Sequence, residues 1–214
     1  MIILLDTLLV TLILTGFLLL GSSRLGASIR ISALQGIMTG LLPLALEHGD
    51  LFSYVSLLGV AVIGLKGYVF PRLLFSALRE SDTSREVQPF VGYMASLFFG
   101  ILFLMGSFWL DTRLNLPVHS SSDLLVPVAF SLMSCGLFLI VARRTAMSQV
   151  IGYLVLENGI YCFGLAVVSG MPLLLELGVL MDIFVAVFVM GIAIYHINRE
   201  FDHIDADRLS ALKG

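Results

Sequence analysis

The chain has 214 residues, of which 58% are hydrophobic and 13% are charged, and its formal net charge is −3. A soluble domain carries about 25% charged residues. With a mean hydropathy of +1.02, this chain is therefore predicted to be an integral membrane protein. At about 20 apolar residues per span, there is room for roughly six to eight helices. Alternating strands of a transmembrane β-barrel are not visible, so the expected fold class is all-α.

Seven membrane-spanning helices are predicted in chain order. The first, residues 2–21, is a full span long and lacks a basic segment before it, so we expect a retained helix and not a signal peptide. The polar stretch 72–88 is expected to be a short surface helix or loop. The remaining six spans are residues 27–46, 51–70, 90–110, 124–141, 146–169 and 172–197.

Basic residues gather in alternate connections between these spans. One set of connections and the tail holds Arg24, Arg72, Arg79, Arg85, Arg143, Arg144, Arg199, Arg208 and Lys213. The opposite set holds Arg113. Because cytoplasmic loops are enriched in Lys and Arg, we predict an outside N-terminus and a cytoplasmic C-terminus. The outer loop 111–123 divides a four-helix region (residues 1–110) from a three-helix region (residues 123–197), and a cytoplasmic tail covers residues 198–214.

Two acids, Glu157 and Asp182, lie inside long apolar runs. An ionised carboxylate deep in hydrocarbon costs at least ~2.5–3.5 kcal/mol, so such a residue must be neutral, partnered or hydrated. At 1.5 Å per residue, Glu157 lies about 20 Å from one membrane face and Asp182 about 15 Å from the other. A short turn makes their helices antiparallel neighbours, which favours a shared proton path. The alternative is a protonated acid that bonds a neighbouring helix and holds the bundle together.

Other polar residues are weaker candidates for the same path. Glu176 is either an outer relay group or an interfacial acid, and His196 has a side chain suited to proton transfer at the cytoplasmic end of its span. Lys66 is either a cation that pairs with a proton-carrying acid or a snorkelling side chain. Asn158 points about 100° away from Glu157 and is expected to bridge helices, as is Gln35.

Small residues and the two cysteines are expected to serve packing. Gly36 and Gly40 are four residues apart, which allows close helix approach in a membrane, and the same spacing recurs at Gly92, Ser96 and Gly100. Cys135 and Cys162 lie in apolar runs and are expected to be small core residues. No metal-ligand spacing, nucleophile with a base, phosphate loop or basic–aromatic patch is visible. We therefore expect no cofactor, no metal and no nucleic-acid partner.

The C-terminal third resembles component E of hydrogenase-4 complexes, which are membrane-bound formate hydrogenlyase and related group 4 hydrogenases. The matching residues are Gly152-Tyr153, Glu157-Asn158-Gly159, Pro172, Glu176-Leu177-Gly178, Asp182, Phe184–Met190 and Leu209–Gly214. The likeness in length and number of spans covers the whole chain, but these specific motifs lie in residues 143–214.

The last three predicted helices also resemble the K subunit of respiratory complex I. Arg143 and Arg144 in a cytoplasmic loop, Asn158 in the next helix and Asp182 in the last fit that pattern. In that family, two membrane glutamates form part of a polar axis that couples proton pumping. Asp182 matches the second position with a shorter side chain. Glu157 differs, because alignment on the arginines and Asn158 places the family's first glutamate at Leu154, one turn earlier.

The resemblance implies a non-catalytic membrane subunit of a hydrogenase-4-like complex in a bacterial or archaeal inner membrane. Nickel–iron and iron–sulphur centres would lie in partner subunits, beside antiporter-like membrane subunits and lipid. The intramembrane acids would then contribute to proton or sodium translocation. The alternatives are a scaffold subunit that relays no ions and a stand-alone ion-coupled transporter.

Overall fold

The computed structural model describes residues 2–46, 54–80, 89–114 and 122–167. Within these ranges the regular structure is entirely helical. Six helical runs of 18 to 22 residues are long and apolar enough to cross a membrane. The predicted all-α membrane architecture is thereby supported, while the seventh predicted span and the tail lie outside the described residues.

Five of the predicted spans correspond to single helices whose ends agree with the prediction to within about three residues. They are α1 (Ile2–Gly21), α2 (Leu25–Leu46), α5 (Tyr93–Arg113), α6 (Leu125–Ala142) and α7 (Ala146–Val167). The other described span is a composite of α3 (Tyr54–Gly64), the π-helical turn η1 (Leu65–Val69) and α4 (Phe70–Glu80).

This composite helix corrects the predicted end of the third span at residue 70. The helix continues through α4, where Phe70, Leu74 and Ala77 are buried in the core at i, i+4 and i+7 spacing. Arg72 and Arg79 lie on its exposed face. The predicted surface helix or loop at residues 72–88 is, up to residue 80, an amphipathic helix whose charges lie on one side and which packs against α2.

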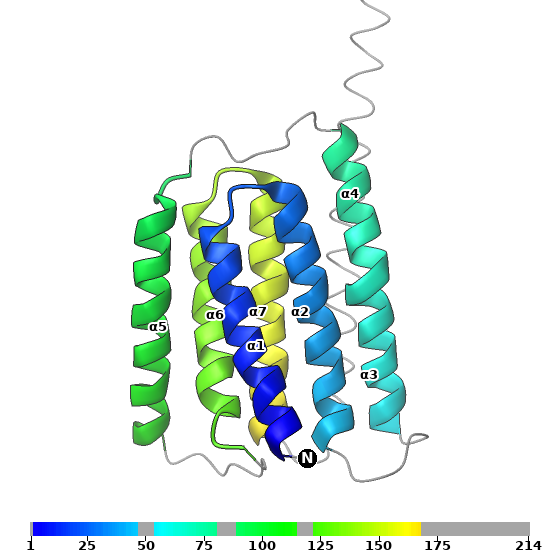
Figure 1. The fold of residues 1–214 in the computed structure, drawn as a ribbon, viewed down its shortest axis with the longest axis vertical. Coiled ribbons are helices and arrows are strands. Elements are labelled where there is room, and N and C mark those ends of the chain that lie inside the picture. The colour runs from blue at the N-terminus through cyan, green and yellow to red at the C-terminus, as the bar shows by residue number, and fades with distance from the viewer. Residues whose placement is uncertain (1, 47–53, 81–88, 115–121, 168–214) are drawn as a thin grey trace, which may run out of the picture.

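Consecutive spans run antiparallel, the α3–α4 run counting as one span, and α1, α2, α6 and α7 lie at the centre of the bundle (Figure 1). Helix α5 lies at one edge and the α3–α4 run at the other. Helices α6 and α7 pack closely through glycines: a Cβ on Gly152 would lie 2.8 Å from Leu139 Cβ and 3.0 Å from the Gly136 carbonyl oxygen. Their backbones therefore approach more closely than larger side chains would permit.

The predicted packing role of the small residues is confirmed at most positions. A Cβ on Gly40 would lie 2.6 Å from Ile63 Cγ1, and one on Gly100 would lie 2.6 Å from Leu20 Cδ1. Ser96 is fully buried. Gly92 differs, because a Cβ there would meet nothing within 4 Å. As expected, Cys135 and Cys162 are buried thiols without a disulfide.

The α1–α2 connection, the α6–α7 connection and the end of α4 lie at one end of the bundle (Figure 1). This brings Arg24, Arg79, Arg143 and Arg144 to the same end. Arg143 is only 1% exposed, and its Nη2 donates a hydrogen bond of 2.5 Å to the Leu20 carbonyl. Grouping of basic residues at one end is what the predicted topology requires.

Candidate functional site

Lys66 lies in the π-helical turn η1. It is the eighth residue of the apolar segment Gly59–Arg79, which is the part of the composite span long and apolar enough to cross a membrane. The amide of Phe70 bonds the carbonyl of Leu65, five residues earlier, which widens the turn. Pro71 follows directly and has no amide hydrogen, so the regular helical bonding is interrupted there in any case. Gly64 and Gly67 flank Lys66 and complete a locally irregular segment.

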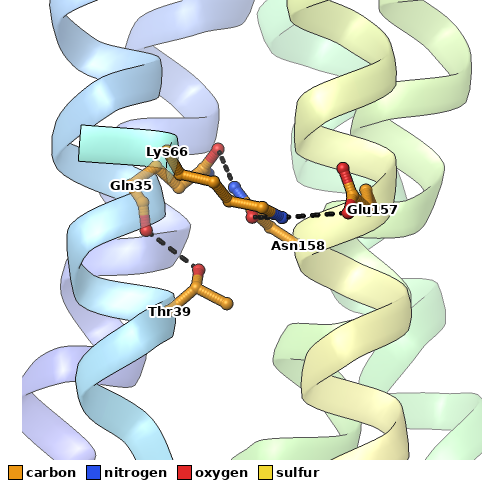
Figure 2. A network of polar contacts seen from close by, with 5 residues as sticks. All are labelled: Gln35, Thr39, Lys66, Glu157 and Asn158. Carbon is orange, nitrogen blue, oxygen red and sulfur yellow. Dashed lines mark hydrogen bonds and ion pairs between the residues drawn. The ribbon is translucent and has the colours of Figure 1, made fainter. Parts of the chain in front are cut away.

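The Lys66 side chain points into the bundle and contacts two neighbouring residues of α7 (Figure 2). Its Nζ lies 3.3 Å from Glu157 Oε1, in an ion pair whose side chains are 5% and 7% exposed. The same Nζ donates a 2.9 Å hydrogen bond to Asn158 Oδ1. Glu157 is the twelfth of 22 residues in α7, so the pair lies near the middle of the bundle.

Asn158 extends this contact to the two N-terminal helices. Its Nδ2 donates to Gln35 Oε1 at 3.4 Å. Gln35 Nε2 in turn donates to Thr15 Oγ1 at 3.3 Å and to the Leu12 carbonyl at 3.5 Å. Thr39 Oγ1 donates to the backbone oxygen of Gln35 at 2.9 Å (Figure 2). The network therefore joins α1, α2, η1 and α7, and Gln35, Thr39 and Asn158 are completely buried.

A glycine on α2 makes the Lys66 position possible. A Cβ added to Gly36 would overlap the Cβ and approach the side-chain stem of Lys66. On the other side of the contact, a Cβ on Gly67 would lie 2.6 Å from Ile37 Cγ1. Because neither residue has a side chain, the π turn sits against α2 and Lys66 passes beside it to α7.

The structure separates the alternatives for Lys66. A snorkelling lysine would place its ammonium group at a membrane face, whereas Lys66 is 5% exposed and bonded inside the bundle. The predicted bridging by Asn158 and Gln35 is observed. Asp182, Glu176 and His196 lie outside the described residues, so a path from Glu157 to Asp182 stays a prediction.

The two arginines of the α6–α7 connection have different surroundings. The Arg143 guanidinium lies 4.5 Å from the Tyr93 ring centre, in addition to its bond to α1. Arg144 is exposed and lies 4.4 Å from the Phe90 ring centre. Arg143 thus supports the packing of three helices, whereas Arg144 lies at the surface.

Thr15 was not singled out from the sequence, and Gly36 was expected to allow close helix approach but was not identified as a site residue. Each is ordinary in a membrane helix, and only the neighbouring helix gives it a role. The π turn had a visible signal, since Gly64, Gly67 and Pro71 surround a lysine within an apolar span. Glycine and proline disturb regular helical bonding, and π turns are frequent at functional sites.

The ionisable groups at this site are one carboxylate, which can accept a proton, and one ammonium group, which can donate hydrogen bonds. The Lys66–Glu157 pair is neutral overall when the ammonium and carboxylate are both ionised. Adding a proton to Glu157 leaves the Lys66 charge without its counterion, which is costly in a buried site. Among the described residues, no group of three His, Cys, Asp or Glu side chains could hold a metal ion.

Comparisons with known proteins give two kinds of relative. The chain is 31% identical over 204 residues to the uncharacterized protein Rv0085 of Mycobacterium tuberculosis, covering 94% of this chain and 92% of that protein. It is 30% identical over 121 residues to hydrogenase-4 component E of Escherichia coli K12, and equally to that of Shigella flexneri. This match spans 56% of the chain and 56% of each relative. No protein-family model and no solved structure matches the chain significantly.

Proposed function

We propose a function for this chain, which belongs to the same protein family as Rv0085 of Mycobacterium tuberculosis. Its partial similarity to hydrogenase-4 component E supports a membrane subunit of a hydrogenase-4-like complex. The six apolar helices among the described residues fit a multi-pass membrane protein, which we assign to the cytoplasmic membrane. Redox chemistry belongs to partner subunits, and antiporter-like membrane subunits are the expected neighbours.

Within this complex, the chain contributes to translocation of protons or sodium ions. The observation that carries this proposal is the ion pair between Lys66 and Glu157, buried near the middle of the bundle. Ionisable residues inside a membrane are costly and usually lie on ion pathways. A pair in which one partner accepts a proton and the other stays charged can couple proton arrival to movement of a positive charge.

Protonation of Glu157 is the central step of the proposed mechanism. The arriving proton bonds to the carboxylate, which becomes neutral, and its attraction to Lys66 is lost. The Lys66 ammonium keeps its hydrogen bond to Asn158 Oδ1 and becomes available to another anion. Loss of the proton to the next carrier restores the original pair, so the cycle needs no other reactant.

The remaining predicted carriers extend this path. We assign Asp182, Glu176 and His196 to the seventh span, with Asp182 as the next acid after Glu157. We retain the predicted topology, with the arginine-rich end of the bundle in the cytoplasm. The chain is divided into a four-helix region (residues 1–110), a three-helix region (residues 123–197) and a cytoplasmic tail (residues 198–214).

A scaffold function is the second candidate. Its support is the hydrogen bonding itself, because Asn158 and Gln35 connect α7 to α1, α2 and η1. In that case Lys66 and Glu157 would hold helices together, and no ion would pass. Removing both charges at once distinguishes the two functions, since a volume-matched apolar pair often replaces a buried ion pair without loss of stability.

The test uses the complete complex in sealed membrane vesicles. We expect Glu157→Gln, and the double change Lys66→Met with Glu157→Met, to abolish redox-driven ion translocation while redox turnover remains measurable. The double variant removes both charges of this pair together, so neither Lys66 nor Glu157 leaves its partner's charge buried alone, and a loss of translocation there cannot be attributed to that defect. Normal translocation by both assembled variants would exclude the relay and support the scaffold.

A further inference from the structure

A small cavity with both polar and apolar walls lies at the end of the bundle that carries Arg24, Arg79, Arg143 and Arg144 (the arginine-rich end). Its walls include Ser22, Ser28, Ser148 and the buried Arg143, together with the apolar side chains of Leu19 and Ile151. The cavity volume is approximately 10 Å³, which is close to what one water molecule requires. Three hydroxyl groups and a guanidinium supply the hydrogen-bond partners that would hold such a water.

Three chain segments connect this cavity to the network around Lys66. On each of them, a cavity residue and a network residue are seven positions apart: Ser22 and Thr15, Ser28 and Gln35, Ile151 and Asn158. Seven residues form about two helical turns, or roughly 10.5 Å. The agreement among the three places the cavity and the network at two levels along α1, α2 and α7, which belong with α6 to the central helices of Figure 1.

Ser32 lies between these two levels on α2. It is 5% exposed and shares a helix face with Ser28 and Gln35, at spacings of four and three residues. These spacings correspond to roughly 6 Å and 4.5 Å along the helix. A single bridging water, with oxygen contacts of about 2.8 Å on each side, connects atoms up to about 5.6 Å apart, which is of the same order as these rises.

We propose that Ser32 is the middle step of a narrow water path between the arginine-rich end and the Lys66–Glu157 pair. The path supplies the proton that the proposed function requires, so it rests on that function. A proton from the outer water bonds to Ser32 Oγ while the hydroxyl proton of Ser32 passes to the inner water. Ser32 is unchanged after the transfer. Lys66 then gives a proton to the Glu157 carboxylate, 3.3 Å away, and takes one from the inner water, so that its ammonium group is restored.

Thiol accessibility tests this path in the full chain within its complex. In a Cys135→Ala, Cys162→Ala background, single cysteines replace Ser32, Ser28 or Leu34 in sealed vesicles of known orientation. Leu34 is the matched control, because it is two positions from Ser32 but 45% exposed on the outer surface of α2. Silver ions are small enough for a narrow path. A silver ion that reaches a thiol replaces its proton and blocks the sulfur against later labelling. Remaining thiols are then labelled with a maleimide after unfolding.

We expect silver added at the arginine-rich side to abolish later labelling of Ser32→Cys and Ser28→Cys, and to leave Leu34→Cys labelled. If Ser32→Cys stays as reactive as Leu34→Cys, or is blocked from the opposite side alone, the proposed path is wrong. Thr15→Cys, at the network itself, gives the same test if Ser32→Cys fails to assemble.

Silver access requires neither redox turnover nor ion pumping, so the path and the proposed function can fail separately. A sealed Ser32 combined with lost translocation in Glu157→Gln overturns the path alone. Silver access to Ser32 combined with normal translocation in Glu157→Gln overturns the proposed function.

Discussion

Asn158 is the residue on which the polar network depends. Its side-chain oxygen accepts from Lys66, and its side-chain nitrogen donates to Gln35. An amide is suited to this position because it offers an acceptor and donors on one neutral group. A carboxylate there would accept from Lys66 but could not donate to Gln35 unless protonated. The amide thus links the charged side chains of the network to the neutral ones.

Replacing Asn158 by alanine should destabilise the protein by about 1–3 kcal/mol, because the buried Gln35 Oε1 loses its donor and Lys66 loses an acceptor. Thr39→Val is the control, since the Thr39 hydroxyl bonds a backbone oxygen of its own helix. The midpoint of thermal unfolding in detergent should fall clearly for Asn158→Ala and little for Thr39→Val. Equal shifts in the two variants would contradict the linking role of Asn158.

At this scale, the sequence identifies polar residues better than it identifies their partners. Depth in an apolar run singles out Glu157, and helical geometry separates Asn158 from it. The sequence offers Lys66 as a cation that pairs with a proton-carrying acid, but it does not select Glu157 over Asp182, because Lys66 and Glu157 are 91 positions apart in the chain. That pairing depends on which helices are adjacent, which hydropathy does not encode.

Among the helices, the polar network depends on the close contact between α2 and the π turn η1, which carries Lys66. Gly36→Ala should push these elements apart, because the new Cβ would overlap Lys66 Cβ. Overpacking of this kind typically costs about 1–3 kcal/mol. It should also weaken the Lys66–Glu157 pair, so we expect both a lower unfolding midpoint and reduced ion translocation in the assembled complex.

Gly64→Ala provides the matched control for this prediction. Gly64 belongs to the same helical run, has helical φ and ψ angles of −62° and −45°, and has nothing within 4 Å of the position that an alanine methyl group would take. Alanine is favoured over glycine in helices by about 1 kcal/mol, so stability should be unchanged or slightly higher. A Gly36→Ala variant that behaves like Gly64→Ala would show that the contact with Lys66 is unimportant.

Helix ends were predictable where a span is uniformly apolar and were not where it is amphipathic. For α1, α6 and α7, hydropathy alone finds the boundaries to within a few residues. For α4, the charges of Arg72 and Arg79 dominate the hydropathy, although Phe70 and Leu74 lie on a continuous buried face. The π turn also changes which residues face α2, so simple helical periodicity cannot carry across it.

Arg143 connects distant regions of the molecule as a whole. It follows α6, donates to the last turn of α1 through the Leu20 carbonyl and lies over the Tyr93 ring at the start of α5. Carbonyl groups in the last turn of a helix lack partners within the helix, and a buried cation satisfies one of them. The arginine-rich end of the bundle is therefore held by an internal contact as well as by its connections.

Replacing Arg143 by methionine keeps much of the side-chain volume but removes the charged donor. The Leu20 carbonyl would then be buried without this hydrogen bond, and we expect a destabilisation of about 1.5–3 kcal/mol. Arg143→Lys should give an intermediate loss of stability. The lysine ammonium group can donate to the Leu20 carbonyl, but it lacks the planar guanidinium that lies over the Tyr93 ring. The matched control is Arg144→Met, because Arg144 is exposed and contacts the Phe90 ring at the surface. Thermal unfolding in detergent should rank Arg143→Met lowest and Arg144→Met close to the unmodified protein; the reverse order would mean that Arg143 does not hold this end together.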